Sequence, residues 1–187
     1  MRPGALAYVM GPSGAGKDTL LNAARASLDG QGFAFAHRYI TRPPVPGDEV
    51  FVPLTTQEFA ARKAAGLFAF DWQARDVGYA IGSEIAHWRQ AGLTVVLSGS
   101  RADWAAGKPA AAGAIPVLIE ASSAVLAARL AARAREDAAE IEARLARAAA
   151  LETAIPNAVR IDNSGALEAS VAAFVAALKQ IQAASAA

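Results

Sequence analysis

The segment from Gly11 to Lys17 has the clearest chemical signature in the sequence. It reads G-P-S-G-A-G-K and fits the pattern G-x-x-x-x-G-K, in which backbone amides wrap a phosphate chain and the lysine ammonium reaches its outer oxygens. An apolar run, Ala5–Met10, precedes the loop, and a stretch with helical spacing follows it, as a phosphate loop requires. We therefore predict a nucleoside triphosphate site at nine consecutive residues: Gly11, Pro12, Ser13, Gly14, Ala15, Gly16, Lys17, Asp18 and Thr19.

Asp18 departs from the usual pattern, in which a serine or threonine follows the lysine and coordinates magnesium. A carboxylate at the phosphate end of the loop is unfavourable unless a cation lies near it. Two interpretations stay open. Asp18 approaches Mg²⁺, directly or through water, or it is a helix-start residue that the helix dipole stabilises.

Arginines supply further positive charge along the chain. Arg129 and Arg133 lie four residues apart and therefore share one face of a helix. One interpretation is a solvated surface, where these arginines pair with the acidic residues between 136 and 142; we favour it for Arg147. For four others we favour contact with phosphate groups: Arg42, Arg133, Arg135 and Arg144.

Composition excludes several classes of protein. Eighteen lysines and arginines against 17 acidic residues leave a net charge of +1, which removes the broad basic surface of a nucleic-acid binder. The absence of cysteine excludes disulfides and thiolate zinc sites and is typical of a reducing compartment. No uncharged apolar run reaches the ~18 residues that span a bilayer. We expect a cytoplasmic protein whose partners are small molecules, with neither nucleic acid nor membrane among them.

The elements that hold these residues alternate between strand and helix. Strands are predicted at 5–10, 33–41, 51–54, 68–73, 93–97 and 115–119. Helices are predicted at 18–28, at 57–65 after a cap at Thr55 or Thr56, from a cap at Ser83 to Gln90, after the strands ending at 97 and 119, and at 166–181. A capping box at Asp137 and Glu140 divides the helical stretch 122–151, and the alanine-rich tail is expected to fray. The alternation predicts a single α/β domain with a parallel sheet between helices.

Several motifs together resemble the guanylate kinase superfamily over nearly the whole chain. They are the loop GPSGAGKDTL, T-R-P at 41–43, Q-E-F at 57–59, the segment around Tyr79, R-L-x-x-R at 129–133 and E-x-x-x-R-L at 140–145. Within it, the chain is more similar to the ribose 1,5-bisphosphate phosphokinases of phosphonate breakdown. The segments that carry this second resemblance are 37–42, 16–18, 98–101, 139–148 and 163–165.

The resemblance implies a three-layer P-loop fold and a reaction. The fold has a core at about 1–32 and 92–181, an acceptor-binding subregion at about 33–91 and a helical lid at about 129–144. In the reaction, ATP with Mg²⁺ phosphorylates the C1 phosphate of ribose 1,5-bisphosphate, giving 5-phosphoribosyl 1-diphosphate and ADP, in a monomer or homodimer. The catalytic residues it implies are Lys17, Arg133, Arg135 and Arg144. Arg42 and Tyr79 are expected to hold the acceptor phosphate, and residues around Asn163 to line the adenine.

The acceptor carries a second phosphate at C5, for which charge alone makes candidates of Arg38, Arg75 and Arg101. Two other functions remain open: a nucleoside monophosphate kinase acting on GMP or AMP, and a guanylate kinase-like module that binds without catalysis. Phe70, where guanylate kinases are expected to place a guanine-reading glutamate, weighs against GMP. Lys17 and the lid arginines weigh against a module without catalysis.

Overall fold

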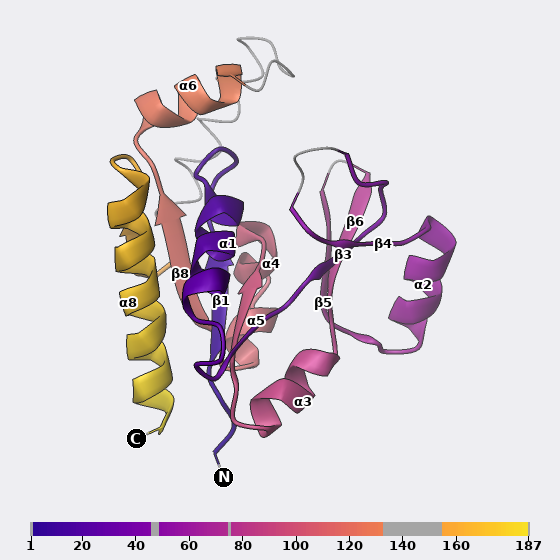
Figure 1. Cartoon of the computed structure of the whole chain (residues 1–187). Helices are drawn as coiled ribbons and strands as arrows, with labels where there is room; N and C mark the ends of the chain where they lie inside the picture. Colours follow the sequence, from indigo (N-terminus) through magenta and orange to yellow (C-terminus); the bar gives the residue numbers. More distant parts are fainter. Residues whose placement is uncertain (1, 46–48, 75, 133–154, 187) are drawn as a thin grey trace.

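A parallel sheet of five strands, in the order β2-β7-β1-β8-β9, lies at the centre of the molecule (Figure 1). The computed structural model describes residues 2–45, 49–74, 76–132 and 155–186. Every residue of β1 and β7 is buried, because helices or other strands cover both faces of the sheet. The strand bounds are β1 Leu6–Met10, β2 Phe33–Phe35, β7 Thr94–Ser98, β8 Ile115–Glu120 and β9 Val159–Asp162.

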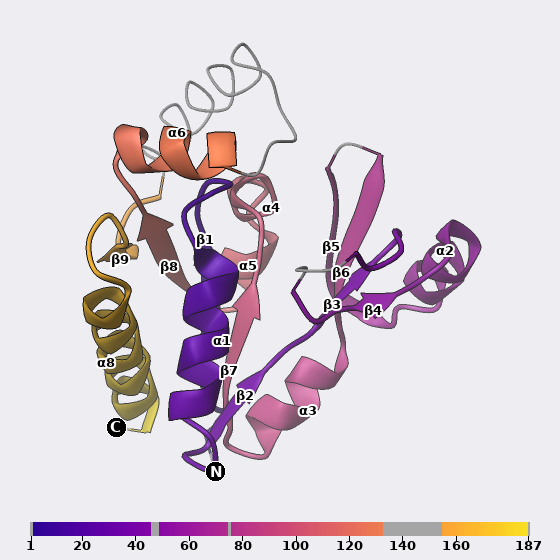
Figure 2. The ribbon, with the colours of Figure 1, turned by 45° about the horizontal axis from the view of Figure 1, so that its top comes forward.

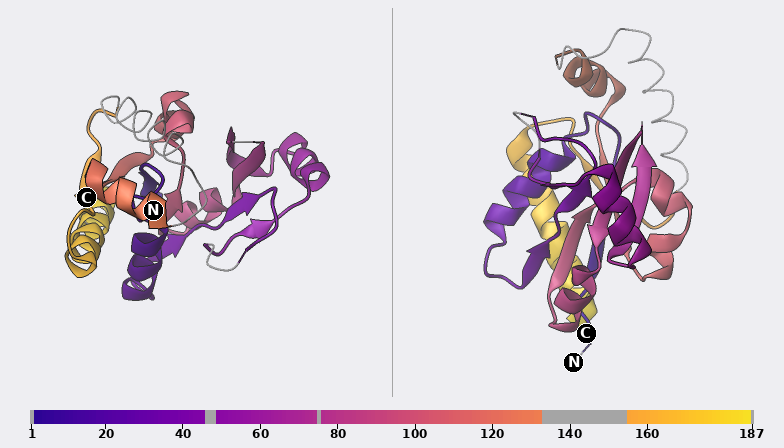
Figure 3. Two further views of the ribbon diagram at one scale, coloured as in Figure 1. Left: turned by 90° about the horizontal axis from the view of Figure 1, so that it is seen from above. Right: turned by 90° about the vertical axis from the view of Figure 1, so that its right-hand side faces the viewer.

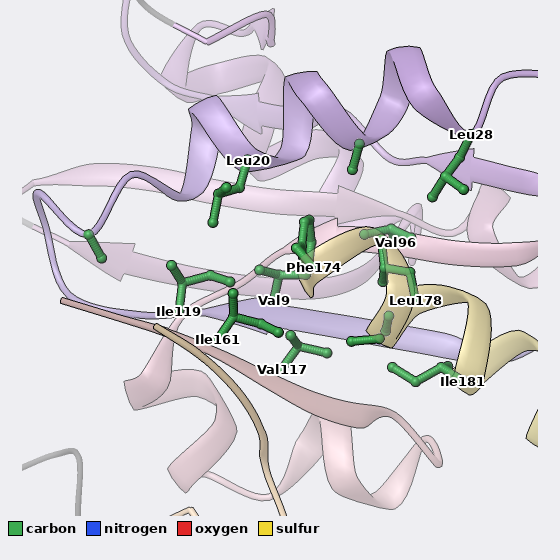
Figure 4. Packing of buried hydrophobic residues seen from close by; sticks show 14 of the residues in the cluster. Val9, Leu20, Leu28, Val96, Val117, Ile119, Ile161, Phe174, Leu178 and Ile181 are labelled. Carbon is green, nitrogen blue, oxygen red and sulfur yellow. The ribbon is translucent and has the colours of Figure 1, made fainter. Parts of the chain in front are cut away.

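Side chains alternate along β1 and build two hydrophobic clusters, one on each face of the sheet. Val9 points to the face covered by α1 (Lys17–Ser27) and α8 (Leu167–Ala186), where it packs with Leu20 and Phe174 (Figure 4). Tyr8 points to the other face, where its cluster includes residues of α3 and α4; α5 follows α4 along the chain. The bounds of these three helices are Glu84–Gln90, Arg101–Ala105 and Lys108–Ala111. This arrangement agrees with the predicted α/β class.

A second sheet, in the order β4-β3-β6-β5, projects to one side of the first (Figure 3). Its bounds are β3 Arg38–Ile40, β4 Val52–Pro53, β5 Phe68–Ala74 and β6 Val77–Gly82, and α2 (Thr56–Ala64) lies beside it. Only β3 and β4 are parallel; the other pairs are antiparallel. The strand-helix alternation did not predict this sheet. The predicted strand 33–41 is divided at Ala36 and His37, so β2 joins the first sheet and β3 the second (Figure 2).

Other local predictions differ from the structure in detail. Of the two predicted caps of α2, Thr55 is the one in the structure. Its Oγ1 accepts a hydrogen bond from the Glu58 amide at 3.0 Å. Ser83 precedes α3 but makes no side-chain cap, because its backbone is already helical. Strands β6 and β9 were not predicted. The alanine-rich tail is helical to Ala186 instead of frayed, since alanine has the highest helix propensity.

Helix α6 (Ser123–Ala132) is the described part of the stretch predicted at 122–151. The predicted helix from Asp137 and the lid beyond residue 132 lie outside the described residues. Within the described ranges, no helix combines the length and the apolarity needed to cross a membrane.

Candidate functional site

The phosphate loop connects the end of β1 to the start of α1. Gly11 lies so close to β8 that a Cβ there would sit 2.2 Å from the Ile119 carbonyl oxygen. Gly16 has a φ of +86° and precedes the first residue of α1, so no side chain at this position caps the helix. The Lys17 ammonium donates to the Gly11 carbonyl at 3.1 Å and to the Pro12 carbonyl at 3.5 Å. The uncapped N-terminus of α1 and the ammonium are both groups that can bind an anion.

Arg129 of α6 and Asn163, which follows β9, hold the loop from the side; we name them the Arg129–Asn163 brace. Asn163 is 2% exposed and its Nδ2 donates to the Ala15 carbonyl at 2.7 Å. Arg129 donates to the Gly14 and Ala15 carbonyls, each at 3.4 Å, and to the Asn163 carbonyl at 3.0 Å. Figures 1 and 2 show α6 next to the loop.

The brace fixes the orientation of the loop amides. The C=O and N–H groups of a trans peptide point in opposite directions. Because the Ala15 carbonyl points to Asn163, the N–H of the same peptide, on Gly16, points away from the brace. A Cβ at Gly16 would lie 2.4 Å from Asn163 Nδ2, so the brace also requires glycine at this position.

A small pocket of about 30 Å³ lies along α1, beside the phosphate loop; we name it the α1 pocket. Its lining comes from helix α1, from the ends of β2 and β7 and from the segment around β3. The residues that line it are Asp18, Leu21, Asn22, Arg25, Phe35, Ala36, Arg38, Glu49, Val50, Val96 and Ser98. Ser98 is the last residue of β7, and Ala36 directly follows β2. Both therefore lie at the carboxyl edge of the parallel sheet, where α/β proteins typically bind ligands.

Unsatisfied polar atoms gather in the α1 pocket. Four buried side-chain atoms that lack a hydrogen-bond partner in the described structure belong to its lining residues: Asp18 Oδ1, Arg25 Nε, Arg38 Nε and Ser98 Oγ. Buried polar groups are normally paired, and each unpaired one is unfavourable. A polar ligand in the α1 pocket would give hydrogen-bond partners to the two arginine Nε donors, the aspartate acceptor and the serine hydroxyl.

Arg38 connects the α1 pocket to the second sheet. Its guanidinium forms an ion pair with Glu49, and its central carbon lies 5.3 Å from the centroid of the Tyr79 ring. Burial lowers the pKa of Arg38, while the nearby Asp18 carboxylate acts in the opposite direction. An arginine stays charged under these conditions, so it retains its affinity for phosphate.

Arg42 lies nearby, with its guanidinium carbon 4.8 Å from the centroid of the Phe51 ring. Its Nη1 donates to the Pro43 carbonyl at 3.2 Å, and it contributes to lowering the Arg38 pKa. The structure therefore brings Arg38, Arg42 and Tyr79 together. Arg42 and Tyr79 do not line the α1 pocket itself.

Other predicted residues are placed elsewhere or lie outside the description. Arg101 begins α4 and does not line the α1 pocket. Phe70 is buried, with its ring edge-on to Tyr8 at 5.8 Å between centroids. The Asn163 side chain contacts the loop at Ala15, so an adenine contact stays a prediction for the residues around it. Four predicted arginines lie outside the described residues: Arg75, Arg133, Arg135 and Arg144.

Sequence reasoning missed two residues of this site. The sequence places Arg129 on a charged helix face, but its contact with a loop 114 residues away leaves no local signal. Arg25 has a local sequence signal, because it shares one face of α1 with Asp18 and Asn22 at the spacing i, i+4, i+7.

The donor set fits a magnesium ion that arrives with a nucleotide. Among the described residues, no cluster of three His, Cys, Asp or Glu side chains is arranged to hold a metal ion. Asp18 Oδ1 is a buried, unpaired carboxylate oxygen next to Lys17. Mg²⁺ typically binds through one or two carboxylates together with substrate phosphates.

Sequence comparison gives close relatives over most of the chain. A ribose 1,5-bisphosphate phosphokinase of Desulfomicrobium baculatum is 48% identical over 163 residues, which cover 87% of each chain. One of Burkholderia pseudomallei is 49% identical over 93% of this chain and 95% of its own. One of Laribacter hongkongensis is 54% identical over 78% of this chain, but the match spans only 36% of that longer protein. No protein-family model matches the chain.

Structure comparison agrees on the fold. The crystal structure of guanylate kinase from Anaplasma phagocytophilum has a TM-score of 0.72 at 14% identity, covering 97% of this chain and 88% of that one. A gluconokinase from Sinorhizobium meliloti has a TM-score of 0.51 at 19% identity, covering 98% and 96%. At these identities the likeness concerns the fold alone.

Proposed function

The chain belongs to the family of ribose 1,5-bisphosphate phosphokinases, and on that premise we propose that it transfers the γ-phosphoryl group of ATP to the C1 phosphate of ribose 1,5-bisphosphate. The products are 5-phosphoribosyl 1-diphosphate and ADP, and the reaction belongs to phosphonate breakdown. The observation that carries the proposal is the arginine-containing α1 pocket directly beside the phosphate loop. The α1 pocket can receive an anionic phosphoryl acceptor next to the ATP that the loop is proposed to bind.

The chemistry requires positioning and charge neutralisation more than proton transfer. An oxygen of the C1 phosphate attacks the γ-phosphorus, the bond from that phosphorus to the β,γ-bridging oxygen breaks, and ADP leaves with the electron pair. A phosphate monoester with a second pKa near ~6 is already largely anionic at neutral pH, so no general base is needed. The obstacle is the repulsion between two anions, which fixed cations reduce.

Each cation has a proposed place in this reaction. Lys17 and the amides at the start of α1 bind the β- and γ-phosphates. Three arginines of the lid stabilise the transferring group: Arg133, Arg135 and Arg144. Arg42 and Tyr79 hold the acceptor phosphate, and Arg38 extends this positive region into the α1 pocket. Mg²⁺, when bound, neutralises phosphate charge, and Asp18 is the residue that would hold it.

We place the enzyme in the cytoplasm, as a monomer or homodimer acting on small molecules. Its organisation is one kinase domain, with the core at about 1–32 and 92–181, the acceptor-binding subregion at about 33–91 and the lid at about 129–144. The second sheet belongs to that subregion.

An acceptor screen tests the function. The purified chain is incubated with ATP, Mg²⁺ and one of ribose 1,5-bisphosphate, GMP or AMP, and phosphorus NMR detects the new diphosphate. Lys17→Met supplies the inactive control. We expect turnover with ribose 1,5-bisphosphate at a kcat/KM at least a hundredfold above that for GMP or AMP. Faster turnover of a nucleotide contradicts the proposal and supports a nucleoside monophosphate kinase. ATP binding without transfer to any acceptor supports a binding module.

A further inference from the structure

Helix α1 presents one continuous face to the α1 pocket. Asp18, Leu21, Asn22 and Arg25 follow the spacing i, i+3, i+4, i+7 and therefore form one stripe. Asp18 is next to the loop lysine, and Arg25 lies seven residues further, about 10 Å along the axis at ~1.5 Å per residue. A ligand that lies along this face reaches from the place of phosphoryl transfer to a second, separate guanidinium.

Arg25 has an unusual environment for an arginine. No carboxylate pairs with it in the part of the chain that the structure describes, whereas Arg38 of the same pocket pairs with Glu49. Its Nε is buried and has no hydrogen-bond partner in that part. Its guanidinium carbon lies 5.7 Å from the centroid of the Phe35 ring, another pocket residue. The ring supports the planar group but satisfies none of its N–H donors in the plane.

We infer that Arg25 binds the C5 phosphate of the acceptor, an inference that rests on the proposed function. A pentose bisphosphate carries two anions separated by the length of the sugar. With its C1 phosphate held by Arg42 and Tyr79 near the Arg38 end of the pocket, its C5 phosphate points along α1 towards Arg25. A phosphate offers the planar guanidinium fork several acceptor oxygens and so pairs the orphaned Nε. Arg25 joins the three arginines that charge alone suggests for this role: Arg38, Arg75 and Arg101.

This subsite also gives a reason for acceptor selectivity. A nucleoside monophosphate has a single phosphate, and its base carries no charge with which to pair Arg25. With such an acceptor Arg25 can meet only neutral acceptor atoms, and a guanidinium pairs with these more weakly than with a phosphate.

Binding measurements test the inference without requiring turnover. Isothermal titration calorimetry gives the dissociation constants of ribose 5-phosphate and ribose 1-phosphate for the wild type, Arg25→Met, Arg25→Lys and Arg160→Met. Arg160 is the matched control, since it is an exposed arginine of β9 paired with Glu120, outside the site. Thermal unfolding of each variant checks the fold. Kinetics with ribose 1,5-bisphosphate and with ribose 1-phosphate as acceptors complete the comparison.

We expect Arg25→Met to weaken ribose 5-phosphate binding, and to raise the KM for ribose 1,5-bisphosphate, by tenfold or more. Ribose 1-phosphate binding should change less than twofold, Arg25→Lys should be intermediate, and Arg160→Met should match the wild type. Equal losses with both monophosphates, or ribose 5-phosphate binding that is absent in the wild type or unchanged in Arg25→Met, overturn the inference. The proposed function fails separately, if the wild type does not phosphorylate ribose 1,5-bisphosphate.

Discussion

Replacing Arg129 with methionine tests whether the Arg129–Asn163 brace holds the phosphate loop in its ATP-binding conformation. Methionine keeps an unbranched apolar side chain on α6 and removes the N–H donors to the Gly14, Ala15 and Asn163 carbonyls. Without these bonds the loop peptides can rotate, and the amide that points away from the brace loses its fixed direction. ATP then binds only after the loop has been ordered.

The distances give the size of the effect. The 3.0 Å bond to the Asn163 carbonyl has ordinary length, and a bond from a charged donor contributes about 1.5 kcal/mol at the lower end of its range. The two bonds of 3.4 Å are long, so we assign them only about 0.3 kcal/mol each. The sum is about 2 kcal/mol, which corresponds to a roughly 30-fold weaker affinity for ATP because 1.4 kcal/mol is tenfold.

Calorimetric titration of ATP into the wild type, Arg129→Met and Arg160→Met measures this loss. A double-mutant cycle with Asn163→Ala adds a second readout. Because both side chains hold the Ala15 carbonyl, the two losses should be non-additive by at least ~0.5 kcal/mol. An ATP affinity within twofold of the wild type in a folded Arg129→Met variant refutes the reasoning, as do additive losses in the cycle.

Three further predictions concern the loop and the buried polar groups. Lys17→Met should lower kcat by about 10²-fold or more, since it removes a cation from the transferring phosphate. An enzyme-coupled assay of ADP release measures kcat, and a loss below tenfold would contradict this role. Asp18→Ser should change the Mg²⁺ concentration that gives half-maximal activity, and an unchanged magnesium requirement refutes a metal role for Asp18. Burial raises the pKa of the Asp103 carboxyl, so the folded chain keeps a proton that the unfolded chain releases above about pH 4. The stability that this group contributes is therefore lost as pH rises from about 4 through the raised pKa of Asp103. Asp103→Asn should remove this loss and flatten the plot of unfolding free energy, measured in urea, against pH. An unchanged slope argues against a raised Asp103 pKa.

The sequence alone was enough for the phosphate loop and the parallel sheet. Both depend on local patterns: the glycine and lysine spacing from Gly11 to Lys17, and short apolar runs that alternate with helical periods. Strands β6 and β9 escaped prediction because the neighbouring strands with which they pair decide whether they form. Likewise, nothing local indicates that the segment 33–41 changes sheet after Phe35.

Only the tertiary structure decided which charged residues surround the loop. The Asn163 side chain contacts Ala15 across 148 positions of the chain, and Arg38 reaches the α1 pocket from a different sheet. Periodicity shows which face of a helix a residue lies on, as it does for Arg25, but not what covers that face. Burial and unpaired donors distinguish a binding arginine from a surface one, and both exist only once distant segments have packed together.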